Sequence, residues 1–423
     1  MIHVVAEGDS VASIAESYGV TESRLIYDNE LPEDGALVVG QALLIRVPEI
    51  TYQVQALDTL YSIAREYDTS ILQLVRNNPY IVAAGALQEN DVLIISYQGE
   101  QPEQNLVVNG YAYPFTRQDL LQESLIYLSE LSVFSYGFTL EGTLIAPETT
   151  YLLEQAQTFS VAPVLVLTSI NENGTFSNQL VNALVENEEL QDKVIDSLLF
   201  TCNEKGYEAV DVDFEYILPQ DRENYVAFIT RLAERLHTQN IEVYVALPPK
   251  TSADQPGLLY EGIDYAGLGR AADGVLLMTY EWGYKYGPPM AVAPIPSVRR
   301  VLEYAVTEIP VEKISMGIPN YAYDWPLPYE RGVTAAQTIG NTQAVSIARQ
   351  NGVSIQYDEQ SETPFFYYTS EGVEHVVWFE DVRSIQAKFD LVKEYGFRGV
   401  GYWNLLRSFR PNWLLLNENF RII

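Results

Sequence analysis

Three carboxylates occupy alternate positions in the short run AVDVDFEY, residues 209–216. Asp211, Asp213 and Glu215 each follow an apolar residue. Side chains at i, i+2 and i+4 of a β-strand point to one face, so the spacing predicts that the three acids converge while the intervening apolar residues face a packed layer. Carboxylates this close raise the pKa of at least one member of the group. A carboxyl group kept protonated near neutral pH in this way can act as a general acid.

The flanking segments predict where this strand lies. A helical run over residues 192–205 precedes it, a second helical run begins at Asp221, and another strand-like run, IEVYVALP, begins at Ile241. Strands that alternate with helices predict a parallel sheet covered on both faces, where an acid cluster is costly and is tolerated mainly for function. An edge strand with one charged, solvent-facing side is the structural alternative that the pattern alone leaves open.

Eight strand-like runs alternate with helical segments from Asn105 to Ile423, which predicts an α/β fold of the (β/α)8 TIM barrel type. The interval between the seventh and eighth runs is too long for one connection. Residues 323–378 contain strand-like pieces of their own, so we expect a small α+β insertion there that walls one side of the site. The eight runs are NLVVNGYAY, LSVFSYGF, PVLVLTS, AVDVDFEY, IEVYVALP, GVLLMTYEW, ISMGIPNY and GVGYWNLL.

The chemistry of such a barrel lies at the carboxyl ends of its strands. Glu215 ends the fourth run, and Tyr280 ends the sixth. Tyrosine and tryptophan at a strand end present flat, amphipathic surfaces that can stack on sugar rings, although packing inside the barrel is an equally ordinary role for each. The predicted substrate-binding residues are Tyr136, Glu281, Trp282, Asn320, Tyr321 and Trp403.

The position of the acids restricts the mechanism. Asp213 and Glu215 project from one strand, so they cannot supply an acid on one face of a sugar and a nucleophile on the other. The remaining acids near strand ends are Glu281 and Asp324. If the sugar carries an N-acetyl group, its own carbonyl oxygen can attack C1 and form an oxazolinium ion. One acid and one orienting carboxylate then suffice.

The first hundred residues contain two copies of one pattern. IHVVAEGDSVASIAESYGV aligns with TYQVQALDTLYSIAREYDT at an offset of 49 residues, and from Gly35 onward the offset becomes 50. Each copy predicts a strand, two helices and a closing strand. We therefore predict two βααβ modules over residues 1–48 and 49–97, a polar linker over residues 98–105, and a catalytic domain over residues 106–423.

The two modules resemble the LysM domain, which binds the N-acetylglucosamine of peptidoglycan and chitin. The resemblance rests on the pattern xVxxxDS/TLxxIAxxY and on the Asn that precedes a loop. Leu57 replaces the glycine that precedes Asp9 in the first copy, and helix capping is an alternative role for the two aspartates. The resemblance implies that the glycan-binding residues are Gly8, Asp9, Ser10, Asp58, Thr59 and Leu60.

The run EAVDVDFE, residues 208–215, resembles the DxxDxDxE signature of glycoside hydrolase family 18. The resemblance implies that Glu215 is the catalytic acid, that Asp213 turns and stabilises the substrate acetamide, and that Asp211 shares a proton with Asp213. It further implies that Tyr280 hydrogen-bonds the acetamido oxygen and that Trp403 forms the floor of the acetamide pocket. Glu208 stands where the signature has its first Asp, and Glu281 stands where the family usually has an Asp.

The run MTYEWGYKYGPPMAVAPI, the paired LysM-like modules and the C-terminal run GYWNLLRSFRPNWLLLNENF look like the spore cortex-lytic N-acetylglucosaminidases of this family. The resemblance implies retaining hydrolysis of the β-1,4 bond after N-acetylglucosamine in peptidoglycan during germination. It also implies a protein made in the cytoplasm without a signal peptide and deposited in the spore coat or cortex region. A chitooligosaccharide hydrolase, a non-catalytic glycan-binding coat protein and a Mg²⁺-dependent enzyme remain alternatives.

The amino-acid composition restricts the classes of molecule that the protein can bind. Against 57 acidic residues the chain has 25 basic ones, so its formal net charge is −32, which disfavours binding to nucleic acid and to anionic membranes. The single Cys202 suggests a packed thiol, and the three histidines do not suggest a zinc cluster. We therefore expect no metal, no cofactor, no nucleic-acid or membrane partner, and a monomer that binds glycan strands.

Overall fold

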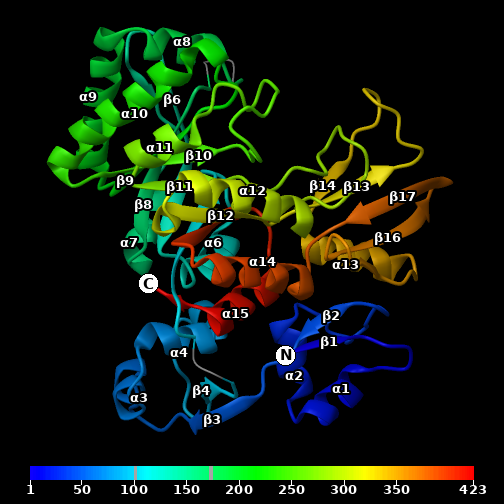
Figure 1. Ribbon diagram of the computed structural model, residues 1–423. Helices are drawn as coiled ribbons and strands as arrows, with labels where there is room; N and C mark the ends of the chain where they lie inside the picture. Colours follow the sequence, from blue (N-terminus) through cyan, green and yellow to red (C-terminus); the bar gives the residue numbers. More distant parts are fainter. Residues whose placement is uncertain (100–101, 171–174) are drawn as a thin grey trace.

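The computed structural model describes residues 1–99, 102–170 and 175–423, and its centre is a closed parallel barrel (Figure 1). Each barrel strand pairs in parallel with its two neighbours, and β5 closes the ring by pairing with both β6 and β18. The predicted (β/α)8 barrel is confirmed. The strands, in order around the barrel, are β5 (Asn105–Ala112), β6 (Glu130–Phe138), β8 (Ala162–Thr168), β9 (Ala209–Asp213), β10 (Glu242–Leu247), β11 (Gly274–Leu277), β12 (Ile314–Pro319) and β18 (Gly399–Trp403).

Helices cover the outside of the barrel. In α9 the Asn187 side chain accepts hydrogen bonds from two backbone N–H groups at the start, and Gly206 ends the helix with a φ of 75°. Cys202 of this helix is buried in the core, and burial raises the pKa of its thiol to about 12. The covering helices are α6 (Gln118–Leu125), α7 (Thr150–Phe159), α8 (Asn178–Val185), α9 (Glu188–Lys205), α10 (Arg222–Leu236), α11 (Tyr265–Ala271), α12 (Ile295–Glu308), α14 (Val382–Tyr395) and α15 (Arg410–Asn419).

Short elements complete this domain. They are the strands β7 (Leu144–Ile145) and β19 (Arg421–Ile422), and the 3-10 turns η1 (Pro219–Asp221), η2 (His237–Gln239) and η3 (Val311–Lys313). Among the helices that the structure describes, none combines the length and the apolar character needed to cross a bilayer.

Strand β9 shows the alternation that the sequence predicts. Val210, Val212 and Phe214 are at most 2% exposed and belong to the core between the barrel and its helices, where the Phe214 ring stacks on Phe228 of α10 at 6.3 Å. The alternate positions therefore face the inside of the barrel. Burial on one face fixes the register of the strand, because a one-residue slip would move every acid into the helix layer.

A second sheet is inserted between β12 and α14. Its five strands pair in antiparallel fashion in the order β14, β13, β17, β16, β15, and Phe366 and Val377 lie in its core without solvent exposure. This insertion lies beside the barrel (Figure 1). Its elements are β13 (Ala322–Pro326), β14 (Gln337–Ile339), α13 (Asn341–Gln350), β15 (Gln356–Asp358), β16 (Thr363–Ser370) and β17 (Val373–Trp378).

The two N-terminal modules each contain an antiparallel strand pair and a helical hairpin, and the second has one helix more than predicted. Residues 100 and 101 of the predicted linker lie outside the described residues. The first module consists of β1 (Ile2–Val4), α1 (Val11–Tyr18), α2 (Glu22–Asp28) and β2 (Ala42–Leu44); the second consists of β3 (Pro48–Gln53), α3 (Leu60–Glu66), α4 (Ile71–Asn77), α5 (Tyr80–Ala84) and β4 (Val92–Tyr97).

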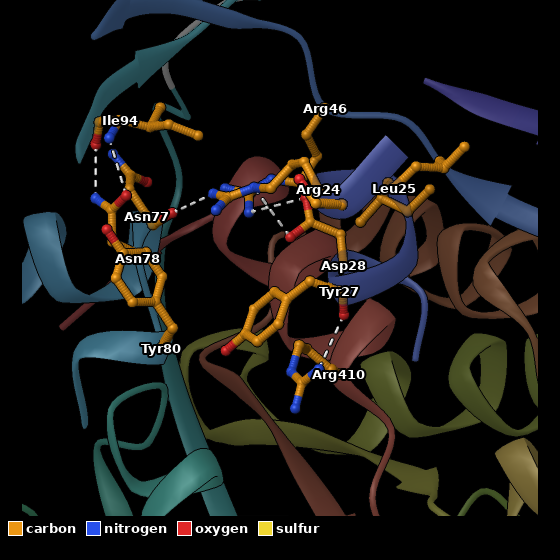
Figure 2. A network of polar contacts seen from close by, with 12 residues as sticks. Arg24, Leu25, Tyr27, Asp28, Arg46, Asn77, Asn78, Tyr80, Ile94 and Arg410 are labelled. Carbon is orange, nitrogen blue, oxygen red and sulfur yellow. Dashed lines mark hydrogen bonds and ion pairs between the residues drawn. The ribbon is translucent and has the colours of Figure 1, made fainter. Parts of the chain in front are cut away.

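A buried polar network joins both modules to the barrel (Figure 2). Arg24 donates to the carbonyl of Asn77 at 2.7 Å and also lies 3.2 Å from a carboxylate oxygen of Asp28. The side chain of Arg46 has no solvent exposure, donates to Glu418 of α15 at 3.0 Å, and lies over the ring of Tyr97 at 3.7 Å. Because these groups are desolvated and mutually paired, the network fixes the modules against α15.

Candidate active site

The acids of β9 form a row that leads from the barrel interior to its mouth. Asp211 and Asp213 are 1% and 6% exposed, whereas Glu215, just beyond the end of the strand, is partly open to solvent. The Oδ1 atoms of both aspartates are buried without a hydrogen-bond partner among the described residues. Of the three carboxyl groups only that of Glu215 is open to solvent at the mouth, and the two aspartates lie behind it.

Burial and mutual repulsion raise the pKa values along the row. Desolvation raises the pKa of Asp211 to about 6, while the hydroxyl of Tyr111 lowers it by donating a hydrogen bond to Oδ2 at 2.5 Å. Desolvation raises the pKa of Asp213 well above its ordinary value, and the charges of Glu215 and Asp211 raise it further. The pKa of each aspartate is therefore raised, and of the two only Asp211 has a hydroxyl donor that stabilises its anion.

Glu215 has the electrostatic setting of a general acid. Desolvation raises the pKa of its carboxyl group, and the charge of Glu281 raises it further. Glu281 lies after β11 and accepts hydrogen bonds from Tyr321 and, at 2.9 Å, from Tyr323. Desolvation also raises the pKa of Glu281, and the two hydroxyl groups oppose that shift. Two tyrosines therefore hold the Glu281 carboxyl group in place, and each donated hydrogen bond favours its ionised form.

Tyr280 lies among these acids. Its ring packs over Gly317 of β12, where an added Cβ would be only 2.7 Å from the ring carbon Cε1. Desolvation first, and then the charges of Asp213 and Glu281, raise the pKa of its hydroxyl well above the ordinary value. The hydroxyl therefore keeps its proton more strongly than an ordinary tyrosine and can donate a hydrogen bond.

Trp403 ends β18 and lies in an aromatic cluster at the barrel mouth. Its ring meets Phe134 at 4.9 Å, Tyr111 at 5.6 Å and Tyr113 at 6.0 Å, each in an edge-on arrangement. Edge-on contacts on several sides fix the plane of the indole, and its partial exposure leaves part of the ring surface available. Phe115, which is 70% exposed, stacks on Tyr113 and extends the aromatic surface outward.

The prediction that Tyr136 binds substrate is wrong. Its side chain has no exposure, its hydroxyl pairs with that of Tyr207 at 3.1 Å, and Lys205 of α9 lies over its ring. The cause is a register irregularity in β6 between Val133 and Tyr136. Because an irregularity of this kind breaks the alternation of faces, Phe134 joins the Trp403 cluster inside the barrel while Tyr136 packs in the helix layer.

Three further predicted residues support the site from outside it. Asn320 is 2% exposed and donates from Nδ2 to the carbonyls of Asn404 and Arg407, each at 3.0 Å, so it braces the loop after β18. Tyr321 is 3% exposed and positions Glu281. Trp282 is half-buried, and its backbone N–H donates to Val292 at 3.0 Å. The structure gives Asn320 and Tyr321 these positioning contacts, and their direct contact with a sugar stays a prediction.

Asp324 does not join the acids at the mouth. Its Oδ1 lies 2.8 Å from Nδ1 of His375, its Oδ2 accepts from Tyr368 at 2.6 Å, and it is 4% exposed. These partners belong to β17 and β16 of the insertion. Strand alternation on β13 directs Tyr323 toward Glu281 and Asp324 to the opposite face, so Asp324 is a structural acid of the insertion.

The glycan-binding residues predicted in the modules lie in the loops after β1 and β3. Asp9 accepts from the N–H of Ala6 at 2.8 Å, and Asp58 accepts from that of Gln55 at 2.7 Å, so each aspartate closes the turn before its helix. The helix caps are Ser10 and Thr59, which is a correction to the capping role considered for the aspartates. Gly8 has a φ of 91°, and Leu60 is the first residue of α3.

Sequence reasoning missed Tyr111 and Tyr323. Tyr111 lies at the end of the first barrel strand, in the run NGYAY, where the rule that placed the acids also applies. Its partner Asp211 is 100 residues away, however, and no local signal pairs them. Among the residues that the structure describes, no group of three or more His, Cys, Asp or Glu side chains has the geometry to hold a metal ion.

Comparison with protein families gives two matches. Residues 108–407 match the family model "Glycosyl hydrolases family 18". Residues 3–46 and 52–96 each match the LysM domain. The first match spans every strand of the barrel from β6 to β18, together with the acid row, Tyr280 and Trp403.

Similar proteins match over the full length of the chain. A cortical fragment-lytic enzyme of Bacillus subtilis (strain 168) is 41% identical over 429 residues, which cover 100% of this chain and 98% of that protein. The enzyme of the same name from Bacillus anthracis is 38% identical over 431 residues, again covering 100% and 98%. The crystal structure of the Bacillus megaterium QM B1551 spore cortex-lytic enzyme SleL superposes with a TM-score of 0.84 at 37% identity, covering 100% of this chain and 98% of that chain.

Proposed function

Because the chain belongs to glycosyl hydrolase family 18, we propose that it hydrolyses the β-1,4 bond after N-acetylglucosamine in spore-cortex peptidoglycan, with the substrate acetamide as the nucleophile. The observation that carries this proposal is the row of three acids that ends in one accessible carboxyl group, Glu215. The cortex-lytic relatives, which match the chain from end to end, support the choice of substrate.

In the first step, the carboxyl group of Glu215 donates its proton to the glycosidic oxygen as the bond to C1 breaks. The acetamido carbonyl oxygen attacks C1 from the other side and forms the oxazolinium ion. Asp213 takes a proton from Asp211, turns toward the acetamide and stabilises its N–H, while Tyr280 donates a hydrogen bond to the acetamido oxygen. Trp403 forms the floor against which the acetamide methyl packs.

In the second step, water attacks C1 on the face that the leaving group vacated. Glu215, now a carboxylate, accepts a proton from that water, and the bond from C1 to the acetamido oxygen breaks. Two inversions at C1 give a product with retained configuration. The burial and the neighbouring Glu281 charge that raise the pKa of Glu215 favour its reprotonation before the next turnover.

The proposal also covers the oligomeric state of the protein, the glycan that it binds and its site of action. The protein acts as a monomer on N-acetylglucosamine-containing glycan strands in the spore cortex, and its LysM-matching region keeps it on that substrate. Two binding sites on one chain raise the local concentration of glycan at the barrel without changing its chemistry. The acidic net charge of −32 gives no long-range attraction to anionic wall polymers, so short-range contacts supply the affinity.

Mass spectrometry of borohydride-reduced fragments released from purified cortex peptidoglycan tests the proposal. The unmodified chain should release fragments that end in reduced N-acetylglucosamine, and Glu215→Gln should release none. Glu234→Gln is the matched control, because Glu234 is an exposed glutamate on the outer helix α10 and lies outside the acid signature. Fragments ending in reduced muramic acid would refute the bond assignment. Release by Glu215→Gln would refute the acid, and release from chitin oligomers alone would refute the cortex as substrate.

A further inference from the structure

The last loop of each module differs in sequence where the two modules otherwise repeat. At the offset of 50 residues that aligns this part of the repeats, Val38, Val39 and Gly40 take the places of Gln88, Glu89 and Asn90. In the second module all three residues are exposed, whereas in the first Val38 is only 4% exposed. Two apolar residues and a glycine thus replace three polar residues in one copy of an otherwise equivalent loop.

The first module's loop is docked on the insertion. Val38 belongs to the insertion's own core, together with Phe366 and Phe379. The carbonyl of Val39 accepts a hydrogen bond from the N–H of Ile355 at 2.9 Å, in the segment before β15. These contacts use the side chain of Val38 and the backbone of Val39, whose own side chain stays 43% exposed.

Gly40 makes the closest approach in this contact. A Cβ at this position would be 1.9 Å from the carbonyl oxygen of Ile355, a separation that no side chain tolerates. Arg383 of α14 donates to the Gly40 carbonyl at 3.3 Å, which ties the loop to the barrel domain as well.

The second module's loop has the opposite character. Asn90 donates its N–H to Val54, and Asp91 donates to Gln88, so the hydrogen bonds of this loop in the described part of the chain stay inside the module. Apolar surface is open nearby on the same module, where Leu57 is 99% exposed and Tyr61 is 64% exposed. An exposed leucine with a φ of 74° and an exposed tyrosine contribute nothing to the module's own core.

We propose that the two modules have different tasks: the second binds the glycan through the loops at residues 55–61 and 86–91, and the first is a fixed bracket whose equivalent loop holds the insertion in place. The proposal rests on the proposed function, because it takes a chain of N-acetylglucosamine units as the ligand. The bracket has a consequence at the active site, since the insertion supplies Tyr323, which holds Glu281 beside the acid. The first module thus supports the barrel mouth instead of tethering substrate.

Hydrogen–deuterium exchange of full-length Glu215→Gln, with and without tetra-N-acetylchitotetraose, tests the assignment by location. At ten times the dissociation constant of the module, exchange over residues 52–62 and 84–92 should slow about tenfold, in proportion to 1 + [L]/Kd. Exchange over the equivalent residues 3–13 and 34–42 should not change. Because exchange reports each segment separately, oligomer bound in the barrel does not obscure the result.

The same experiment without ligand tests the bracket with no substitution in either module. Exchange over residues 34–42 should be at least about tenfold slower than over residues 84–92, because docking through the Val39 and Gly40 carbonyls restrains opening of the first loop, whereas the hydrogen bonds of the second loop stay inside its module in the described part of the chain. Equal ligand protection in both modules, or protection in neither, would overturn the division of tasks. The fragment analysis of cortex peptidoglycan is scored separately, so failure of this inference and failure of the proposed hydrolysis are distinguishable.

Exchanging the two loops provides a matched pair of variants. Val38→Gln/Val39→Glu/Gly40→Asn should undock the first loop and speed exchange at residues 34–42 and 353–358 at least about tenfold. The reverse change, Gln88→Val/Glu89→Val/Asn90→Gly, should leave those segments unchanged. Unaltered exchange in the first variant would refute the bracket. If that variant does not fold, the comparison of exchange between the two loops of the unsubstituted protein still tests whether the first loop is docked.

Discussion

Removal of one hydroxyl from the barrel interior, in Tyr111→Phe, should slow the reaction strongly. The Tyr111 hydroxyl donates to Asp211 at 2.5 Å in a fully buried position, and no other protein donor among the described residues reaches that carboxylate. When Asp213 takes the proton and turns toward the acetamide, Asp211 remains as an anion that only this hydroxyl stabilises. The substitution should therefore destabilise the state from which the acetamide attacks.

The structure sets the size of this effect. A hydrogen bond to a charged group contributes about 1.5–3 kcal/mol, and the short, fully desolvated contact belongs in that range. Since about 1.4 kcal/mol corresponds to a factor of ten, kcat/KM should fall roughly 10- to 160-fold. The loss should appear in kcat with KM little changed, because the charge on Asp211 develops after the substrate has bound.

The assay is steady-state release of reducing ends from purified cortex fragments. Tyr113→Phe is the matched control, because Tyr113 lies two residues further along the same segment, is half-buried, and donates its hydroxyl to no carboxylate among the described residues. The control should retain kcat/KM within about twofold. A folded Tyr111→Phe protein with the rate of the unmodified chain, or an equal loss in both variants, would refute the reasoning about Asp211.

Other substitutions test the electrostatics, the binding surface and the domain junction. Glu281→Gln removes a charge that raises the pKa of Glu215, so that pKa should fall, and the basic limb of the kcat/KM profile against pH should move to lower pH; an unchanged limb would contradict the assigned coupling. Trp403→Ala should lower kcat/KM at least about tenfold, because the acetamide loses its floor, and a rate within twofold would count against that role. Arg46→Ala removes the buried partner of Glu418, and of Asp28 at 4.0 Å, and should lower the free energy of unfolding by about 3 kcal/mol, measured by urea denaturation. Arg299→Ala, at an exposed pair with Glu394, should cost below about 1 kcal/mol, and equal losses in both would contradict burial as the deciding factor.

The acid row could be predicted from sequence because it depends on a strictly local rule. The two-residue period of a strand places Asp211, Asp213 and Glu215 on one face, and the apolar residues between them need only a core behind the strand. The same rule failed for Tyr136. A register irregularity between Val133 and Tyr136 reverses the faces of β6, and residues 133–136 themselves contain no glycine or proline that would predict it.

Contacts between segments that are distant in the sequence could not be predicted from it, for a different reason. The bond from Tyr323 to Glu281 spans 42 residues and depends on how the insertion is placed against the barrel. The docking of Val38 depends equally on a surface that begins some 280 residues later. The apolar character of that loop is visible in the sequence, but no neighbouring residue indicates that the loop packs against the insertion. Periodicity predicts on which face of a strand a side chain lies, but only the tertiary structure determines which residues that face contacts.

In the proposed mechanism the acetamide of the substrate, and no protein carboxylate, attacks C1. A series of matched oligosaccharides whose reacting sugar carries N-acetyl, N-fluoroacetyl, N-difluoroacetyl or N-trifluoroacetyl tests it directly, because each fluorine weakens the carbonyl oxygen as a nucleophile and changes the shape of the group little. The measurement is kcat for each substrate with the unmodified chain. The value of kcat should fall with every added fluorine, whereas the same kcat across the series would rule out the acetamide as the nucleophile.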